Sequence, residues 1–295
     1  VRERSQGRIN IKVYHSSQLL AGKQTSEFLL LRNGAIVFAL ASTINWSPQI
    51  KELNLPALPF FLAVQPDRYK AMDAILAGKS GKMMTQAVEK KGVKIIGWTE
   101  NGFRELTTSK GPITKPEDLR GLKIRVVGSP IFIETFRALG ANPVNMNWSE
   151  ATTGFQQGVV DGQEGCFNNV VTLKFYEAQK YATQINYSVH SANIIASERW
   201  LQSLPEKERN ALIRAGKEAM EYERTKVAGM LEADDKLMVE HGMELLGVVE
   251  DLPEWIRLGR TAWPKCYEVI GDGNAEKGKA VMDIVLAKKE ALAKK

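Results

Sequence analysis

"GLKIRVVGSPIFIETFRALGANP", residues 121–143, decides the fold class of the chain. The β-branched run at 122–127 predicts a short buried strand, Gly-Ser-Pro ends it, and a helix is expected at about 131–139. A strand that leads directly into a helix is typical of α/β proteins. Arg125 lies among aliphatic residues in this strand, and arginine is seldom fully buried unless it is paired. The partner of Arg125 is the first functional question.

The rest of the chain repeats this alternation. Strands are expected at 8–14, 35–42, 93–98, 102–109 and 160–165, and helices at 18–34 and at 67–91 with a break near 78–81. The strand at 35–42 is apolar enough to be buried on both faces. The segment at 42–61 is expected to be a loop because three prolines interrupt it. The alternation predicts mostly parallel sheets.

Two long segments predict two lobes. "INYSVHSANIIAS" (185–197) is too long an extended segment for one compact sheet. Between Pro205 and His241 there are no further prolines and only two glycines, so a continuous helix of roughly 55 Å is expected at 1.5 Å per residue. A small domain is about 30 Å across. Both segments should therefore cross between two α/β lobes that are joined by a hinge of several strands.

Composition excludes several classes of protein. The chain has 295 residues, 44% hydrophobic and 25% charged, which is typical of soluble globular proteins. No apolar stretch approaches the roughly 18 residues of a membrane helix. The 40 basic and 34 acidic residues are mixed along the chain, which argues against a nucleic-acid surface. No signal peptide is found and the chain begins at Val1, so we expect a removed leader or a trimmed N-terminus.

Common enzyme motifs are absent from the sequence. It contains no HExxH, GxSxG, Walker A or dinucleotide fingerprint, and no cofactor or metal is expected. Cys166 and Cys266 lack metal-ligand spacing and form either a disulfide or, as we favour, two buried free thiols. The three histidines, His15, His190 and His241, stand alone and are interpreted as structural.

Asp161 and Glu164 leave an enzyme alternative open. They lie three residues apart in "VVDGQEG" and can in principle act as an acid and a base. On a segment that passes from strand to loop, however, their side chains would point in different directions. We therefore favour structural roles in a turn.

The remaining polar candidates suit an anion. Arg125 lies at the carboxyl end of a strand, where α/β proteins bind ligands, and Arg104 lies in a second apolar stretch. Two guanidinium groups can hold a carboxylate bidentately. The alternative for each arginine is an ion pair with an internal Asp or Glu. Trp46 and Trp148 lie in predicted loops, where a ring can cover the apolar face of a ligand or simply pack.

Four stretches of the chain resemble the solute-binding proteins of tripartite ATP-independent periplasmic (TRAP) transporters. They are "RINIKVYHSSQL", "ENGFRELTTSKGPITKPEDLRGLKIRVVGSP", "ALGANPVNMNWSEATTGFQQGVVDGQEG" and "KFYEAQKY". The resemblance implies a two-lobed periplasmic binding protein fold with a ligand cleft between the lobes, hinge strands and a long lobe-spanning helix. It also implies a monomeric periplasmic receptor without enzymatic activity, which delivers an organic acid to a membrane permease driven by a sodium gradient.

The resemblance also implies roles for individual residues. The arginine of the "LKIRV" strand, here Arg125, binds the ligand carboxylate, and the arginine of "NGFR", here Arg104, assists it. The aromatic residue before "SE", here Trp148, lines the pocket. The loop after "FALAS" carries contacts that vary with the substrate, and its candidates are Ser42, Asn45 and Trp46.

The chain departs from the family pattern in two places. The family usually reads "DGQENP", with the asparagine bonding the ligand, whereas this chain reads "DGQEGC" and has Gly165, which offers only backbone. We expect Phe167, Asn168 or Asn169 to reach the ligand instead. Family members also usually carry a first strand and most of a first helix before "VRERSQGRI", which form a central strand and one rim of the pocket, and this chain lacks them.

We therefore expect a two-lobed α/β receptor for a carboxylate-bearing solute. Lobe I is expected at 1–101 plus 191–230 and lobe II at 102–190 plus 231–295. The candidate site contains Trp46 and Trp148, and the sequence shows no second cluster of basic residues. Both features favour a monocarboxylate with a polyol or ring body over a compact dicarboxylate. The alternatives are a small-molecule enzyme that uses Asp161 or Glu164 in the same cleft and a sensory binding protein of the same fold.

Overall fold

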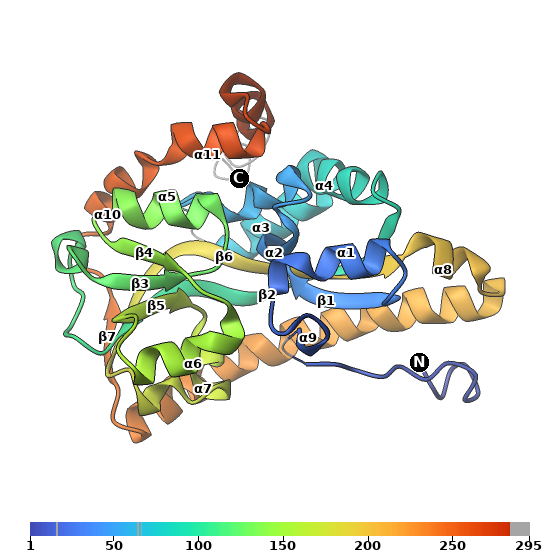
Figure 1. Ribbon diagram of the computed structural model, residues 1–295, viewed down its shortest axis with the longest axis horizontal. Helices are drawn as coiled ribbons and strands as arrows, with labels where there is room; N and C mark the ends of the chain where they lie inside the picture. Colours follow the sequence, from blue (N-terminus) through green and yellow to red (C-terminus); the bar gives the residue numbers. More distant parts are fainter. Residues whose placement is uncertain (16, 64, 66, 284–295) are drawn as a thin grey trace.

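The computed structural model describes residues 1–15, 17–63, 65 and 67–283, and a mixed sheet forms its centre (Figure 1). Within these residues the strand order is β1-β6-β2-β5-β3-β4, and β7 pairs with β6 outside this order. The strands are β1 (Phe38–Ser42), β2 (Val93–Thr108), β3 (Lys123–Val126), β4 (Asn142–Asn145), β5 (Gly162–Gly165), β6 (Tyr181–Ser197) and β7 (Glu244–Val248).

The direction of the strands differs from the sequence-based expectation. β3 is parallel to β4 and β5, and β7 is parallel to β6. The pairs β1–β6, β6–β2 and β2–β5 are antiparallel. The expectation of mostly parallel sheets is therefore wrong for the centre of the sheet, because its two longest strands run in opposite directions between the two halves of the molecule.

β2 and β6 connect these two halves. The strands expected separately at 93–98 and 102–109 form the single 16-residue β2, and the expected strand at 185–197 is part of the 17-residue β6. At about 3.3 Å per residue each strand is roughly 50 Å long. Their pairing shifts register between Ile95 and Gly97, between Glu100 and Phe103 and between Arg104 and Leu106. Such irregularities bend and twist a strand.

Helices lie on both sides of the sheet (Figure 1). α5 and α10 lie on one side of β3, β4 and β5, and α6 and α7 lie on the other, while α1, α3 and α4 accompany the β1 half. The expected helix at 67–91 is confirmed as α3 and α4, which meet at Gly78. The α-helices are α1 (Glu27–Arg32), α2 (Thr43–Trp46), α3 (Arg68–Ala77), α4 (Lys79–Glu89), α5 (Pro130–Ala138), α6 (Trp148–Gln156), α7 (Phe167–Thr172), α8 (Glu198–Ser203), α9 (Glu206–Glu240), α10 (Leu252–Arg260) and α11 (Trp263–Ile270).

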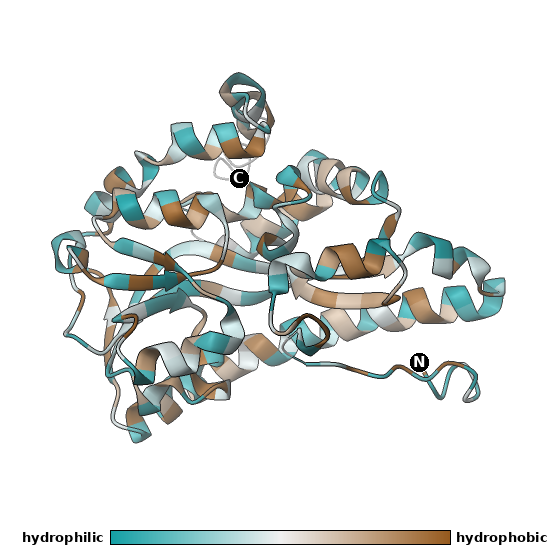
Figure 2. Ribbon diagram, in the orientation of Figure 1, coloured by the Kyte–Doolittle hydropathy of each residue, from teal (hydrophilic) through white to brown (hydrophobic). Residues whose placement is uncertain are grey.

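The main hydrophobic core extends from α1 to α11. It includes Phe28, Trp46, Phe132 and Trp255, while a separate cluster forms around Phe175. Figure 2 shows hydrophobic residues on β1 and α1 and mixed hydropathy along α9. In the part of the chain that the structure describes, no helix is long and apolar enough to cross a membrane.

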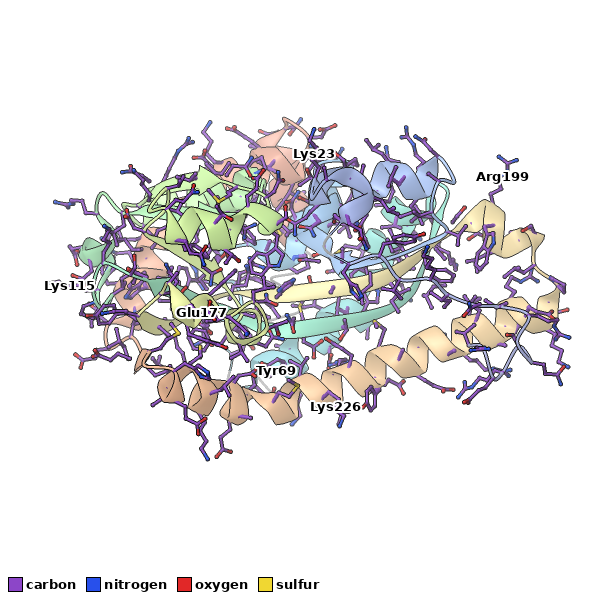
Figure 3. All side chains as sticks on the ribbon, turned by 60° about the horizontal axis from the view of Figure 1, so that its bottom comes forward. Lys23, Tyr69, Lys115, Glu177, Arg199 and Lys226 are labelled. Atoms are coloured by element: carbon purple, nitrogen blue, oxygen red, sulfur yellow. The ribbon has the colours of Figure 1, made fainter. Side chains whose placement is uncertain are left out.

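α9 confirms the expected long helix. Its 35 residues extend about 52 Å at 1.5 Å per residue, and it runs beside β2 and β6 (Figures 1 and 3). Two glycines allow this close approach. A Cβ atom on Gly216 of α9 would lie 2.3 Å from Cγ2 of Ile96, and one on Gly97 of β2 would lie 2.8 Å from Cγ of Met220.

The N-terminal segment differs most from expectation. Residues 8–14 pair with no described strand, and Val13 is 64% exposed. The expected strand is wrong because alternating apolar residues form a strand only where a neighbour takes up their backbone hydrogen bonds. The expected helix at 18–34 is mostly wrong as well, since only Glu27–Arg32 is α-helical. Gly22, at φ +81°, adopts a left-handed conformation that interrupts a helix.

The next segment is also different from expectation. β1 lies at the edge of the described sheet, and Leu40 is 58% exposed, so this strand is not buried on both faces. The expected loop at 42–61 contains α2 and a 3-10 helix at Lys51–Ala57, and most of it is buried. Its prolines exclude a long α-helix but are compatible with these short turns.

The contact between α9 and β2 leaves no room for a methyl group at Gly216. We expect Gly216→Ala to lower the free energy of unfolding by about 1–3 kcal/mol, the usual cost of overpacking. Gly229→Ala on the same helix is the matched control, because its Cβ would meet nothing within 4 Å. Alanine there should stabilise the helix by about 1 kcal/mol. Chemical denaturation measures both effects, and a Gly216→Ala protein as stable as the control would contradict the close packing.

Candidate functional site

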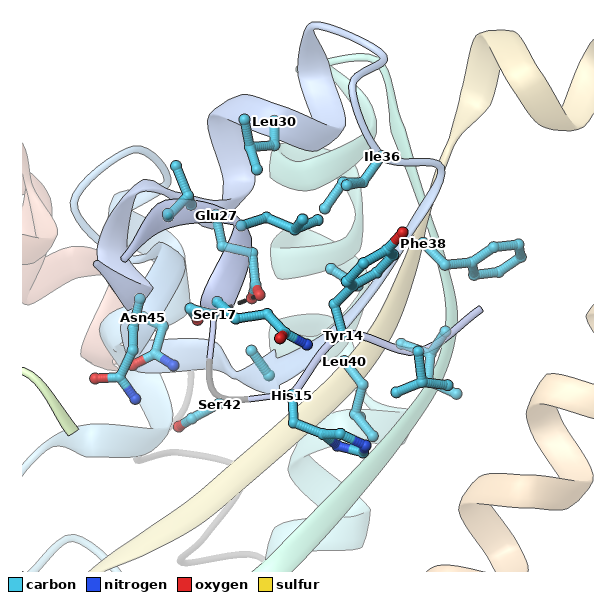
Figure 4. Close-up of a pocket in the computed structure, with 18 of the residues that line it drawn as sticks. Tyr14, His15, Ser17, Glu27, Leu30, Ile36, Phe38, Leu40, Ser42 and Asn45 are labelled. Carbon is cyan, nitrogen blue, oxygen red and sulfur yellow. Dashed lines mark hydrogen bonds between the residues drawn. The ribbon is translucent and has the colours of Figure 1, made fainter. Parts of the chain in front are cut away.

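A cavity of about 940 Å³ lies between the β1 half of the molecule and the β3 half. One wall comes from the segment at 9–20 and from α1, β1 and α2. The other comes from β2, β3, α6, α7 and β6. Figure 4 shows the first wall, where Glu27, Ser42 and Asn45 contribute polar side chains. The cavity thus lies where β2 and β6 pass from one half to the other.

Four neighbouring strands carry a row of polar side chains beside this cavity. In sheet order these are His190 on β6, Arg104 on β2, Glu164 on β5 and Arg125 on β3. His190 and the two arginines line the cavity, while Glu164 is fully buried. Adjacent strands are about 4.8 Å apart, so side chains that are remote in sequence become neighbours.

Arg104 forms a buried ion pair with Glu164. Its Nε and Nη2 atoms donate to the two carboxylate oxygens at 2.5 and 2.9 Å, and the hydroxyl of Tyr187 also donates to this carboxylate. Burial disfavours the charge of Arg104, but the attraction of Glu164 outweighs it and raises the pKa of Arg104 above its usual value. The internal pair considered from the sequence is therefore present for Arg104.

Arg125 has a different set of contacts. Its Nε and Nη2 atoms donate to the backbone oxygen of Met146 at 3.0 and 2.9 Å, and its Cζ atom lies 5.0 Å from the ring centroid of Trp148. Among the residues that the structure describes, no carboxylate forms a salt bridge with it. Arg125 is only 2% exposed, and burial lowers its pKa to about 10.

The row therefore carries an excess of one positive charge. Two guanidinium groups are buried with one carboxylate, and Arg104 already holds that carboxylate with two hydrogen bonds. A buried charge without a partner costs several kcal/mol. Because Arg125 lines the cavity, an anion that entered it would compensate this charge through charge-assisted hydrogen bonds.

Trp148 lies at the start of α6, beside Arg125. Asn147 caps this helix together with Glu150. The backbone N–H of Trp148 donates to Oε1 of Gln24 at 3.2 Å. This bond joins the segment before α1 to α6 across the cavity, and the indole packs 5.2 Å from the ring of Phe175.

The other predicted ligand contacts fall into two groups. Ser42 and Asn45 line the cavity (Figure 4), and so does Asn169. Ser42 also donates from Oγ to the backbone oxygen of Ser191 at 3.2 Å. The residues outside the cavity lining are Trp46, Gly165, Phe167 and Asn168.

All four have contacts elsewhere: Gly165 pairs with Glu105 of β2, and Phe167 lies in the cluster around Phe175. Trp46 is fully buried in the core, 6.4 Å from the ring of Phe28. The side chain of Asn168 accepts from Nδ2 of Asn101 at 3.0 Å. For all four residues, a direct ligand contact stays a prediction.

Glu27 and His190 line the cavity but are absent from the sequence-based ligand candidates. Figure 4 shows the carboxylate of Glu27 next to Ser17, whose Oγ donates to it at 3.4 Å. Burial raises the pKa of Glu27. No motif in the surrounding sequence identifies either residue as a ligand contact. Glu27 begins a short helix and His190 lies within a long strand, and both are far in sequence from the two arginines.

The acid–base pair considered from the sequence is not formed. Glu164 is engaged by Arg104 and Tyr187, whereas Oδ2 of Asp161 accepts from the backbone N–H of Lys123 at 2.9 Å. Both cysteines are free and buried, which confirms the favoured interpretation. Within the described ranges, no group of three or more His, Cys, Asp or Glu side chains could hold a metal ion.

Glu164→Gln should destabilise the protein, because Arg104 would remain buried without a counter-charge. Removing one partner of a buried ion pair costs about 3–5 kcal/mol. Glu134→Gln removes the partly exposed partner of the exposed Arg137 and is the matched control, with an expected loss below about 1 kcal/mol. Urea unfolding compares the two variants. Equal small losses would contradict the structural role of the Arg104–Glu164 pair.

The chain matches a known protein family over most of its length. The family model described as "Bacterial extracellular solute-binding protein, family 7" matches residues 1–268. The 2,3-diketo-L-gulonate-binding periplasmic protein YiaO of Escherichia coli (strain K12) is 30% identical over 248 residues, which are 84% of this chain and 72% of that protein.

Solved structures agree with this match. A TRAP periplasmic solute-binding protein from Ralstonia eutropha H16 with bound (S)-2-acetolactate is 38% identical, with a TM-score of 0.87 over 100% of this chain and 91% of that chain. An apo, open and partially disordered TRAP solute-binding protein from Rhodobacter sphaeroides is 34% identical, with a TM-score of 0.75 over 97% of this chain and 91% of that chain.

Proposed function

The chain belongs to the bacterial extracellular solute-binding proteins of family 7, the receptors of TRAP transporters, and we propose that it binds an organic monocarboxylate in its central cavity and delivers it to a membrane permease. The observation that carries this proposal is the buried charge of Arg125. Its guanidinium faces the cavity and has no described carboxylate partner. A ligand carboxylate would supply the missing counter-charge.

The ligands of relatives support a carboxylate. The Ralstonia protein was solved with acetolactate, and the Escherichia coli relative is named for 2,3-diketo-L-gulonate. Both compounds are organic acids. The same chemistry suits Arg125, because a planar guanidinium and a carboxylate form paired hydrogen bonds.

The charges around the cavity favour one carboxylate over two. Of the two buried arginines in its lining, Arg104 is paired with Glu164, whereas Arg125 forms no salt bridge within the described residues; Lys12, the other cation of the lining, is exposed on the N-terminal segment. On the opposite wall stands Glu27, whose carboxylate would repel a second anionic group in its ionised form. Hydroxyl or carbonyl groups suit this wall better, since Ser42, Asn45 and Glu27 offer hydrogen bonds.

We propose that rotation of two lobes encloses the ligand. Lobe I comprises 1–101 plus 191–230, and lobe II comprises 102–190 plus 231–295. Residues 284–295 of lobe II lie outside the described part of the chain. The irregular pairing of β2 with β6 between Glu100 and Phe103 coincides with the proposed boundary and supports a hinge there. The hydrogen bond from Trp148 to Gln24 bridges the proposed lobes. The TM-score is 0.87 with the acetolactate-bound Ralstonia protein and 0.75 with the open Rhodobacter protein, and this difference also favours a closed form for this chain.

We further propose that the protein acts in the periplasm as a monomeric carrier without catalysis. Family membership supports this location and role. The enzyme alternative is disfavoured because Glu164 is already engaged by Arg104 and Tyr187 and is separated from Asp161. Uptake and sensing would use the same binding site, so a deletion strain that fails to take up the acid distinguishes transport from a sensory role.

Arg125→Ala should abolish most of the affinity for the acid. A thermal-shift screen of organic acids first identifies a ligand, since one at a hundred times its Kd adds about 2.7 kcal/mol of stability. Loss of the buried partner should then cost about 3–5 kcal/mol, or roughly two to three and a half decades in Kd. Arg125→Lys should also weaken binding, because a point charge cannot replace the bidentate fork.

Titration calorimetry with the acid from the screen measures this loss. Arg137→Ala is the control, because Arg137 is an exposed arginine whose partner is Glu134 on the same helix. An unchanged Kd in Arg125→Ala would contradict the assignment of Arg125 as the carboxylate partner.

Trp148 tests whether the cavity recognises more than charge. Its indole lies beside Arg125 at the start of α6, where it can cover the apolar face of a ligand. Trp148→Ala should therefore weaken binding of a bulky sugar acid more than that of a short acid, while Trp148→Phe should retain most of both. The ratio of the two affinity losses is the measurement. Equal losses would show that Trp148 serves only to pack against Phe175.

A further inference from the structure

His190 is the cavity-lining residue that the proposed carboxylate contact leaves without a role. It lies on β6, next to the strand that carries Arg104. Ile194, four residues further along the same strand, also lines the cavity, so this face of β6 forms part of its wall. A ligand held by Arg125 would thus have β6 and His190 on the side toward Arg104.

The Nδ1 atom of His190 is occupied by a cysteine. It lies 3.3 Å from Sγ of Cys166, the residue between β5 and α7. Cys166 is 2% exposed, and burial raises the pKa of its thiol, so the sulfur keeps its proton. Burial and the nearby charge of Arg104 lower the pKa of His190 to about 3, so the imidazole is neutral.

The contact between these two neutral groups is compatible with either tautomer of the ring. A neutral imidazole has one donor and one acceptor nitrogen, and a thiol is both a weak donor and a weak acceptor. When the S–H donates to Nδ1, the ring proton must be on Nε2. In the part of the chain that the structure describes, no group accepts a hydrogen bond from Nε2. In that arrangement the nitrogen left for the cavity is an N–H donor.

We infer that the thiol of Cys166 donates to Nδ1 of His190 and that the Nε2–H group of His190 donates a hydrogen bond to a hydroxyl or carbonyl oxygen of the bound acid. Cys166 acts as a positioning residue that holds the donor tautomer. The ligand class is then the hydroxy and oxo monocarboxylic acids. This inference rests on the proposed function, since it assumes that Arg125 holds the carboxylate. A neutral donor recognises a neutral oxygen here and adds no second charge to the cavity.

The tautomer is tested without any ligand. Two-dimensional ¹⁵N NMR of the histidine rings in the full chain distinguishes a protonated Nε2 from a protonated Nδ1. We expect His190 to be neutral and protonated on Nε2. Cys166→Ser keeps a donor at this position and should keep the tautomer, whereas Cys166→Ala should release it. A ring protonated on Nδ1 in the unmodified protein overturns the inference.

The ligand preference is tested with acids of one carbon skeleton. The probes are butanoate, 2-hydroxybutanoate, 2-oxobutanoate and 3-hydroxybutanoate, and the measurement is Kd by calorimetry. We expect at least one oxygenated acid to bind about ten- to a hundredfold more tightly than butanoate, because butanoate would leave a buried donor unpaired. His190→Leu should bring this ratio close to one, and His190→Gln, which retains an amide donor, should preserve part of it.

His241→Leu is the matched control, because His241 is exposed at the end of α9 and lies outside the cavity lining. It should leave the ratio unchanged. A ratio that survives His190→Leu, while Arg125→Ala still abolishes binding, overturns the role of His190 and leaves the proposed function standing. If none of the four acids nor any acid of the wider screen binds, the proposed function fails and this inference fails with it.

Discussion

The proposed binding site depends on an imbalance of charge inside the sheet. Arg104 and Arg125 are both buried, but only Arg104 has an internal carboxylate. Glu164 binds Arg104 with both oxygens and also accepts from Tyr187, so its hydrogen-bonding capacity is directed away from Arg125. The free protein therefore holds a positive charge in a poorly solvated position, where the attraction for an incoming anion is larger than it would be in water.

The backbone oxygen of Met146 keeps this charge in position. It accepts from two nitrogens of Arg125 and thereby orients the guanidinium without neutralising it. The indole of Trp148 stacks over the same group at 5.0 Å. An arginine preorganised in this way loses little conformational freedom when a ligand binds. Charge compensation would then set the class of ligand, while the neutral groups of the wall select among acids by their oxygens and their bulk.

The proposed enclosure and release of a solute would depend on the two long strands. β2 and β6 run through the whole molecule and carry Arg104 and His190 into the cavity, while Gln24 reaches α6 from the other side. Irregular pairing between the strands gives local freedom to bend. The close contact of Gly216 with Ile96 keeps α9 against the same strands, so bending of the sheet and of the helix must be coupled.

Local patterns in the sequence were sufficient for much of this description. β-branched runs predicted β3 and most of β6, and the absence of helix breakers predicted α9, because strand and helix periodicity depend on near neighbours in the chain. The resemblance carried by "NGFR", "LKIRV" and "NMNWSE" identified Arg104, Arg125 and Trp148, and all three line the cavity.

Tertiary structure decided the remainder. The segment at 8–14 alternates like a strand, but no described strand bonds to it, and a sequence pattern cannot supply that neighbour. The buried position of Trp46 and the presence of Glu27 in the cavity likewise depend on which elements pack together. Above all, either arginine could have been the paired one. Glu164 lies 60 residues from Arg104 in sequence, and only the order of β2, β5 and β3 in the sheet determines which guanidinium receives its carboxylate and which is left facing the cavity.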